Sequence, residues 1–531
     1  MLKKTSVDLK TSGVLNKLVS DYLDKESFLR PYYSFFPDKN GYRDILKTKP
    51  YQGFDRKILT KILNKQSLLT SNTSEKSLAN IELLNNDSCY TITTGHQLCL
   101  FTGPLYFLYK IISAINLAEK LKIEFPANDF VPVYWMASED HDFPEVNNFH
   151  FQGKKIEWNS EQQGAVGDFI TSELKSLSSS FEALLGKSEN SAYLTTLFEK
   201  SYLEQKTLAD ATRYLVNELF GEYGIVVLDG NDSEFKQQFK EHFKRDIFDN
   251  KAYLTTASSI SSLQEKSYQI QVNPRLINCF YLEKGSRLRI EKQNEQFNLV
   301  GTDRVFSRAE LEKIIDEHPE QISPNVVLRP LYQQVILPNL AYIGGPGELA
   351  YWLEFKSFFD ESGVLFPILT PRNFVSIIDK VTAQKINKLG LSVPSIYKSE
   401  QELIKEIQLK NNAYFELGDE EADLRKLYDK ILKRTAGIDK TLEGSVSAEL
   451  KRSLNGFSRM SAKANKAQRR KLETELKRIR DIKGSLFPNG VPQERYENFS
   501  SFYLSFGKNF IEMLKDQLDP IEISQTVLLE S

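Results

Sequence analysis

The sequence of 531 residues contains few cysteines and no long apolar segment. Its three cysteines, Cys89, Cys99 and Cys279, form no Cys-x-x-Cys pair, and no His and Cys residues have zinc-site spacing. No apolar run reaches the length of about 18 residues that a membrane span needs. Charged residues, Lys3 and Lys4 among them, interrupt the N-terminus before a signal sequence could form. These absences argue against a disulfide scaffold, a structural zinc site and a membrane protein, and we expect a cytoplasmic location.

The sequence also lacks a surplus of charge. Its 69 basic and 71 acidic residues give a formal charge of −2, so no global basic field can hold a nucleic acid. The hydrophobic fraction of 40% is typical of a folded globular protein, and the length exceeds what one hydrophobic core supports. We therefore expect several domains and small-molecule substrates, with neither nucleic acid nor membrane as a partner.

The most informative stretch reads as a βαβ unit. A strand over residues 90–94 leads into a loop over 95–104 that contains Gly95 and Gly103, a helix over 105–122 and a second strand over 131–137. A glycine loop before a helix N-terminus favours anion binding. Because ligands bind at the carboxyl ends of parallel strands, we expect His96 and His141, which follow the two strands, to face each other across one cleft.

The remaining chain predicts further α/β elements and a helical C-terminal part. Residues 174–220 have a helical pattern, residues 224–230 form a short apolar strand, and residues 279–290 read as a hairpin within a small β-rich insertion. A second glycine loop at 344–348 opens a helix, and a last core strand covers 366–369. Beyond residue 377, apolar residues recur at spacings of three and four, which predicts an antiparallel coiled coil.

Several of these segments carry residues suited to catalysis or binding. The loop at Thr94, Gly95 and His96 resembles the His-x-Gly-His signature of class I nucleotidylyl transferases, although Thr93 replaces the first histidine; a local turn is an equal alternative. The cluster Glu139 to Asp142, after the apolar residue Trp135, could act as a general base, bind a cation or hold an ammonium group. Backbone amides at 344–348 could cradle an anion or form a tight turn. Arg329 and Arg372, each expected at a strand end beside a proline, could clamp a carboxylate or phosphate.

Taken together, these motifs resemble the BshC family, the cysteine-adding enzymes of bacillithiol biosynthesis. The similarity rests on four segments in the same order along nearly the whole chain: Thr94-Gly95-His96-Gln97 with residues 100–110, Pro132-Val133-Tyr134-Trp135 with residues 139–143, Leu328-Arg329-Pro330, and residues 345–352.

The resemblance implies a Rossmann-like parallel-sheet core with two connecting insertions, and a C-terminal coiled coil through which two copies form a homodimer. The expected divisions are core segments over 1–160, 221–250 and 322–378, a helical insertion over 161–220, a β-containing insertion over 251–321, the coiled coil over 379–487, and a segment over 488–531 that packs on the core.

The implied reaction joins the carboxyl group of cysteine to the amine of glucosaminyl-malate. A free carboxylate does not form an amide spontaneously in water, so the reaction needs activation, most simply as an acyl-adenylate or acyl phosphate from ATP (or ADP as the bound form), with Mg²⁺ possible. The expected catalytic residues are His96, Asp140, His141 and Asp142. The expected substrate- and nucleotide-binding residues are Thr94, Gly95, Gln97, Thr102, Gly103, Tyr109, Lys110, Trp135, Glu139, Arg329, Gln333, Gly345, Gly347, Glu348, Tyr351 and Arg372. Alternatives are a nucleotide- or metal-binding scaffold, or a metal-dependent phosphotransferase or hydrolase, that needs a partner.

Overall fold

The computed structural model describes residues 2–48 and 55–530. The chain divides into two compact units. The core unit comprises residues 2–376 and 492–528, and the second unit comprises residues 377–491, together with residue 529 onward.

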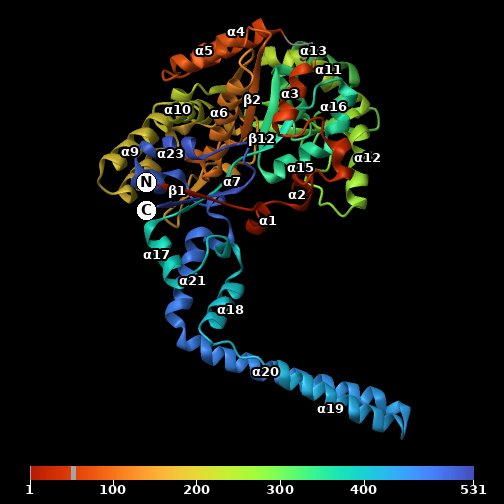
Figure 1. Cartoon of the computed structure of the whole chain (residues 1–531). Helices are drawn as coiled ribbons and strands as arrows, with labels where there is room; N and C mark the ends of the chain where they lie inside the picture. The colour runs from red at the N-terminus through yellow and green to blue at the C-terminus, as the bar shows by residue number, and fades with distance from the viewer. Residues whose placement is uncertain (1, 49–54, 531) are drawn as a thin grey trace. The chain divides into compact units, whose positions relative to one another are not determined.

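A five-stranded parallel sheet lies at the centre of the core unit (Figure 1). Its strands, in spatial order, are β13 (Ile368–Pro371), β12 (Asn339–Gly344), β2 (Cys89–His96), β3 (Asp129–Met136) and β6 (Val226–Asp229). The chain moves outward from β2 through β3 to β6, then returns to the other side of β2 at β12. This reversal makes the carboxyl ends of β2 and β12 the topological switch point, where ligands bind in open α/β sheets.

Helices cover both faces of this sheet. Helix α6 (Tyr106–Glu124) packs on one face, where its small residues Ala114 and Ala118 contact Ile92 and Ile343 within one buried cluster. The other face is covered by α4 (Arg56–Ser67), α5 (Glu75–Leu83), α11 (Ser233–Asp249), α14 (Leu328–Ile336) and α15 (Pro346–Glu354). Because both faces are buried, strands such as β3 and β6 are nearly continuous apolar runs, while the central strand β2 carries buried threonines.

Two insertions extend from the core. The first is helical, with α8 (Lys175–Leu185), α9 (Glu189–Tyr202) and α10 (Leu208–Phe220). The second carries a five-stranded antiparallel sheet of β10 (Val305–Phe306), β9 (Gln296–Leu299), β8 (Ser286–Gln293), β7 (Cys279–Glu283) and β11 (Ile322–Pro324). The insertions touch each other, because a Cβ atom added to Gly164 would lie 2.7 Å from the carbonyl carbon of Gly285.

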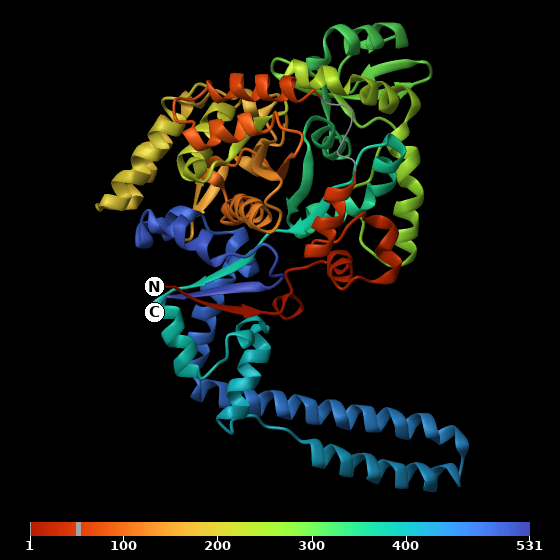
Figure 2. The same ribbon diagram turned by 45° about the horizontal axis from the view of Figure 1, so that its top comes forward.

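The last part of the chain rejoins the core unit after residue 491. It contains α22 (Phe499–Phe506), α23 (Asn509–Gln517) and β15 (Gln525–Glu530). Strand β15 lies between β1 (Leu2–Val7) and β14 (Phe374–Ile378) in a separate three-stranded sheet, so the two ends of the chain lie side by side (Figure 2).

Apart from the ends of β14 and β15, the regular structure of the second unit is helical, and its two longest helices form a hairpin (Figure 2). Helices α19 (Gly418–Ala436) and α20 (Glu443–Lys471) run antiparallel, with Tyr428 and Ser453 joined by their hydroxyl groups at 3.0 Å. Neither helix contains a buried residue.

The predicted fold class is confirmed by the parallel sheet, the insertions and the helical hairpin. One local prediction is wrong: residues 328–336 form helix α14, so Arg329 lies in the first turn of a helix and not at the end of a strand. The preceding Asn325 explains the start, since its side chain accepts hydrogen bonds from the amides of Val327 and Leu328.

Candidate functional site

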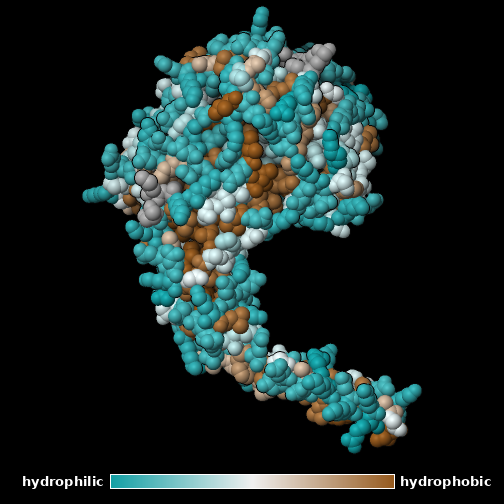
Figure 3. Space-filling model, viewed as in Figure 1, coloured by the Kyte–Doolittle hydropathy of each residue, from teal (hydrophilic) through white to brown (hydrophobic). Residues whose placement is uncertain are grey.

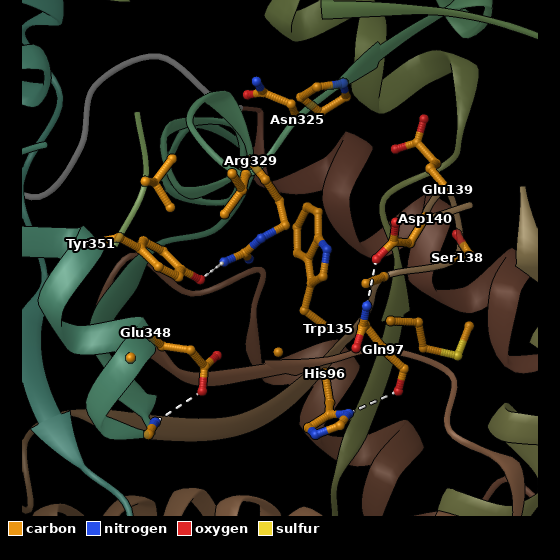
Figure 4. Close-up of a pocket in the computed structure, with 18 of the residues that line it drawn as sticks. His96, Gln97, Trp135, Ser138, Glu139, Asp140, Asn325, Arg329, Glu348 and Tyr351 are labelled. Carbon is orange, nitrogen blue, oxygen red and sulfur yellow. Dashed lines mark hydrogen bonds between the residues drawn. The ribbon is translucent and has the colours of Figure 1, made fainter. Parts of the chain in front are cut away.

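A cavity of about 630 Å³ opens at the switch point of the sheet (Figure 4). Its walls come from the residues that follow β2, β3 and β12, from the segment 324–329, and from the second insertion. Seven basic and three acidic side chains line it, so its lining carries an excess of positive charge. Such a cavity favours anionic ligands.

The end of β2 contributes Gly95, His96 and Gln97 to the cavity. The Nδ1 atom of His96 lies 3.0 Å from the carbonyl oxygen of Gln97, and since a carbonyl only accepts, Nδ1 carries the proton. Burial, together with the positive charge of Lys110, lowers the pKa of His96 to about 4. The imidazole is therefore neutral at pH 7, and its Nε2 atom has a free lone pair that can accept a proton.

An ion pair with a buried lysine, Lys110, and a half-buried glutamate, Glu348, lies beside this loop. The Lys110 ammonium donates to both carboxylate oxygens of Glu348, at 2.9 and 2.8 Å, and also to the carbonyl of Gly95. Glu348 additionally accepts from the Tyr342 hydroxyl and the Gly345 amide. Although burial acts to raise the pKa of Glu348, the Lys110 ammonium and these hydrogen bonds lower it to about 2. Lys110 thus lines the cavity with its charge already neutralised, which disfavours a direct role towards a phosphoryl group.

Two carboxylates of the acidic cluster after β3, Asp140 and Glu139, have different partners. Asp140 accepts from the side-chain amide of Gln97 at 2.7 Å, and that amide also contacts Glu145 at 2.8 Å (Figure 4). Burial acts to raise the pKa of Asp140, but hydrogen bonds from His141 and Gln97 and the charge of Arg287 outweigh it and lower the pKa. Glu139 pairs with the fully buried Lys236 at 2.6 Å. Asp140 is therefore the carboxylate of this cluster that is best placed to hold a substrate ammonium.

Arg329 reaches into the cavity from the first turn of α14 (Figure 4). Its guanidinium donates to Gln333 at 3.1 Å and to the Tyr351 hydroxyl at 3.2 Å. Among the described residues, no carboxylate lies within 4.0 Å of it. Arg329 is half-buried. A cation that is partly removed from water and has no ion-pair partner is costly, so this arginine fits an anionic ligand.

The predicted role of Arg372 as a free clamp disagrees with the structure. Although Arg372 lines the cavity, its Nη1 and Nη2 atoms bind the carboxylate of Glu494 at 3.0 and 2.6 Å, with both side chains buried. Glu494 belongs to the returning C-terminal segment, which no local sequence pattern connects to Arg372.

The cavity contains thirteen of the twenty residues that were predicted for the site. The cavity brings together Gly95, His96, Gln97, Lys110, Trp135, Glu139, Asp140, Arg329, Gly345, Gly347, Glu348, Tyr351 and Arg372, all of which were predicted, and also Tyr106, which was not. Seven predicted residues are not among the lining residues: Thr94, Thr102, Gly103, Tyr109, His141, Asp142 and Gln333.

Each of these seven has a local reason. The hydroxyl of Thr94 donates to β12, and the oxygen of Gln333 accepts from Arg329. Thr102 and Tyr109 are buried, and Asp142 occupies the N-cap position of the short helix α7 (Phe143–Val146).

The loop that follows Gln97 turns away from the cavity. Asn498 donates to the carbonyl groups of Phe101 and Gly103 at 2.7 and 2.6 Å, and the amide of Phe101 donates to the Tyr202 hydroxyl at 2.6 Å. The amide of Leu105 donates to the carbonyl of Glu497. The expected phosphate cradle over residues 95–103 is therefore reduced to its first residues, because Phe101 and Gly103 bind Tyr202 of the first insertion and Asn498 of the C-terminal segment.

His141 points towards the second insertion. Its ring packs against Phe280 with a centroid distance of 5.5 Å, and Arg287 lies 3.0 Å from its Nδ1 atom. The two histidines that were expected to face each other thus differ: His96 lines the cavity and His141 supports the loop that carries Asp140.

The sequence reasoning missed the basic residues of the second insertion and of the returning segment: Arg275, Arg287, Arg289 and Arg495. The alternation along β8 was the available signal for two of them, since Arg287 and Arg289 lie on one face of a strand.

In the described part of the chain, no three His, Cys, Asp or Glu side chains are grouped so as to hold a metal ion. A search of the same residues for a helix with the length and apolarity of a membrane span finds none.

The parallel sheet with a basic cavity at its switch point defines a Rossmann-like protein with a site for an anionic ligand. Residues 2–373 match the family described as "Bacillithiol biosynthesis BshC, N-terminal Rossmann-like domain", and residues 375–530 match its "C-terminal coiled-coil domain". The chain therefore belongs to the BshC family.

Relatives of known description agree over the full length. A protein of Flavobacterium psychrophilum named "Putative cysteine ligase BshC" is 42% identical over 529 residues, which cover 98% of both chains. Proteins of the same name from Flavobacterium johnsoniae and Chlorobaculum tepidum are 40% and 31% identical, over 98% and 90% of this chain and 99% and 89% of theirs. The predicted family and the assignment to the ligases are confirmed.

Proposed function

We propose that this protein joins the carboxyl group of cysteine to the amine of glucosaminyl-malate in the cytoplasm, with activation by ATP. Membership of the BshC family supports the reaction class. The observation that carries the proposal is the cavity itself, in which the uncompensated cation Arg329 and the acceptors His96 and Asp140 line one space. This arrangement suits a substrate that carries both carboxylate and ammonium groups.

ATP fits the excess positive charge of the cavity, but not the whole of the expected glycine loop. Its phosphates would lie against Gly95 and Arg329, where the missing side chain leaves space: a Cβ atom at Gly95 would be 3.5 Å from Nη1 of Arg329. When bound, ATP would supply the activation of the cysteine carboxyl group. The basic residues that line the cavity would neutralise the phosphate charge.

His96 and Asp140 would act on the amine. Asp140, ionised and fixed by Gln97, would hold the ammonium group of the substrate. The amine nitrogen must lose a proton as the amide bond forms, and Nε2 of the neutral His96 would accept it. Lys110 and Glu348 would hold the loop that carries His96, since Lys110 binds the carbonyl of Gly95.

The test is an assay of the purified full chain with ATP, Mg²⁺, cysteine and glucosaminyl-malate. Bacillithiol is detected by mass spectrometry, and released pyrophosphate or phosphate is measured in parallel. We expect release that depends on cysteine. His96→Asn and Asp140→Asn should each reduce kcat by about 10²-fold or more, the range for loss of general acid–base catalysis.

The matched control is His318→Asn, because His318 is exposed and pairs only with Glu320 in the described chain. It should turn over at the wild-type rate. Full activity of both site variants would refute the roles of His96 and Asp140. Nucleotide binding without turnover would favour the alternative of a scaffold that needs a partner.

We also propose that two copies form a homodimer through the α19–α20 hairpin. The hairpin leaves apolar side chains uncovered within the chain, as Figure 3 shows; Leu427 and Met460 are 53% and 52% exposed. A second copy of the hairpin would cover them. Sedimentation of the full chain tests this, and a monomer at micromolar concentration would refute it.

A further inference from the structure

One face of the β7–β8 hairpin turns basic residues towards the cavity. Arg289 lies directly opposite Phe280 in the antiparallel register, and Arg287 stacks on the Phe280 ring at 4.1 Å. All three line the cavity, whereas the alternate residues Tyr281 and Ile290 are buried in the core. The period of two along a strand thus separates a packing face from a basic face.

The three arginines of the insertion that line the cavity, Arg275, Arg287 and Arg289, are not equivalent. Arg287 is held by the protein: it donates to the Ser323 hydroxyl and the Pro324 carbonyl, both at 3.0 Å, and lies beside His141. Its side chain is 7% exposed. These bonds give Arg287 a positioning role, because they leave it little capacity to bind a ligand.

Arg275 and Arg289 form a fork around one carboxylate oxygen. The Nη1 atoms of Arg289 and Arg275 lie 3.1 and 3.9 Å from the same Oε1 atom of Glu291. Two like charges so close together repel unless an anion lies between them. Glu291 is 43% exposed, and one carboxylate only partly compensates two guanidinium groups. Because both arginines also line the cavity, the fork has the position and the charge to take a further carboxylate.

The other basic residues of the cavity also differ in whether the protein neutralises their charge. Lys110 and Arg372 each have a carboxylate partner: the half-buried Glu348 and the buried Glu494. The positive charge that remains for a ligand thus lies with Arg329, with Arg495 and with the second insertion. Since Arg329 is assigned to the phosphates of ATP, the second insertion is left to hold a carboxylate of the other substrate.

We propose that the second insertion is the specificity element for the malate group, with Arg275 and Arg289 holding one of its carboxylates, and with Glu291 as the partner of both arginines in the free protein. This inference rests on the proposed function, since it takes glucosaminyl-malate as the substrate. It assigns the recognition of the acid to residues outside the Rossmann-like core.

The experiment is titration calorimetry of the full chain with glucosaminyl-malate, without cysteine or nucleotide. We expect Arg289→Ala to raise Kd by about tenfold or more, because a charge-assisted hydrogen bond is lost. Arg275→Ala should have a smaller effect, since Arg275 is 58% exposed. Arg289→Lys should recover part of the affinity, and Glu291→Gln should lower Kd by removing the competing carboxylate.

Two controls separate recognition of malate from a general defect. The first is Arg308→Ala, because Arg308 lies on α13 (Arg308–Glu317) of the same insertion, stacks on Phe248 at 4.5 Å and does not line the cavity. Its Kd should equal that of the wild type. The second is titration with glucosamine, which lacks both carboxylates; Arg289→Ala should leave that Kd unchanged.

The outcomes also separate this inference from the proposed function. Wild-type affinity in folded Arg289→Ala and Arg275→Ala variants would overturn the fork while leaving the ligase proposal intact, and so would an equal loss of affinity for glucosamine. Absence of binding by the wild-type chain would refute both. In turnover assays, Arg289→Ala should raise KM for glucosaminyl-malate with kcat unchanged, as expected for uniform binding.

Discussion

Replacing Glu494 by Gln should destabilise the core unit strongly. The Glu494 carboxylate accepts from Arg372 at 3.0 and 2.6 Å and from the Val375 amide at 2.9 Å. The side chains of Arg372 and Glu494 are only 3% and 4% exposed. A glutamine preserves the shape, but it turns two acceptors into one acceptor and one donor and leaves the buried guanidinium without a counter-charge. Breaking a buried ion pair from one side costs about 3–5 kcal/mol.

The assay is urea unfolding followed by tryptophan fluorescence. All three tryptophans, Trp135, Trp158 and Trp352, lie in the core unit, so the signal reports on the unit that contains the ion pair. We expect the free energy of unfolding of Glu494→Gln to fall by about 3–5 kcal/mol. Adding Arg372→Met should recover part of this loss, because the buried charge is then removed as well.

The control is Glu124→Gln in the exposed pair of Lys39 and Glu124, whose side chains are 60% and 38% exposed. Its cost should lie within the range of about 0.2–1 kcal/mol for surface pairs. If Glu494→Gln costs no more than this control, the ion pair does not hold the segment in place. Arg372 would then again be a candidate for a ligand clamp.

Three further predictions concern the loop, the titration of its histidine and the hairpin. Gly103→Ala should destabilise the core unit by more than 1 kcal/mol in thermal unfolding, since Gly103 has φ +60° and a Cβ atom there would lie 2.7 Å from the Cβ atom of Cys99. The control is Gly484→Ala in an open helical position, which should be neutral or slightly stabilising. The pKa of His96 is lowered to about 4, so the free energy of unfolding should fall as the pH drops from 6.5 towards 4, because His96 takes up a proton in the unfolded chain but not in the folded chain. His96→Asn should flatten this part of the pH profile of stability. Replacing residues 418–471 by a short flexible linker should give a monomer by sedimentation while the Kd for glucosaminyl-malate stays unchanged; retention of the dimer would place the interface elsewhere.

The parallel sheet could be predicted because its signals are local. The segments around Val133 and Val227 are short apolar runs, and the segment around Ile92 is rich in β-branched residues; Gly95 and Gly230 mark where two of the loops begin. Helix α14 could not be identified in the same way, because Val326, Val327 and Pro330 favour an extended conformation. The structure favours a helix there because Asn325 caps it and its apolar side packs into the core.

The candidate site was predictable only where it follows the sheet. The residues after β2, β3 and β12 come together by topology alone, so His96, Asp140 and Glu348 could be placed in one cavity before any coordinates. Contacts between distant segments have no such signal. The partners of Arg372 and of the loop at Gly103 lie more than 100 residues away along the chain, and only folding brings them together.

The ion pair of Arg372 and Glu494 also explains how the core unit can accommodate the insertion of residues 377–491 without losing its cavity. The chain leaves the core unit after residue 376 and returns at residue 492, and Glu494 binds both Arg372 and Val375 at the point of departure. The segments that precede and follow residues 377–491 are therefore joined to each other inside the core unit. Closing a longer loop adds little entropic cost, since that cost grows only with the logarithm of its length. The position of Arg372 and Arg495 at the cavity is thus set by this clamp, and it does not require any particular arrangement of residues 377–491.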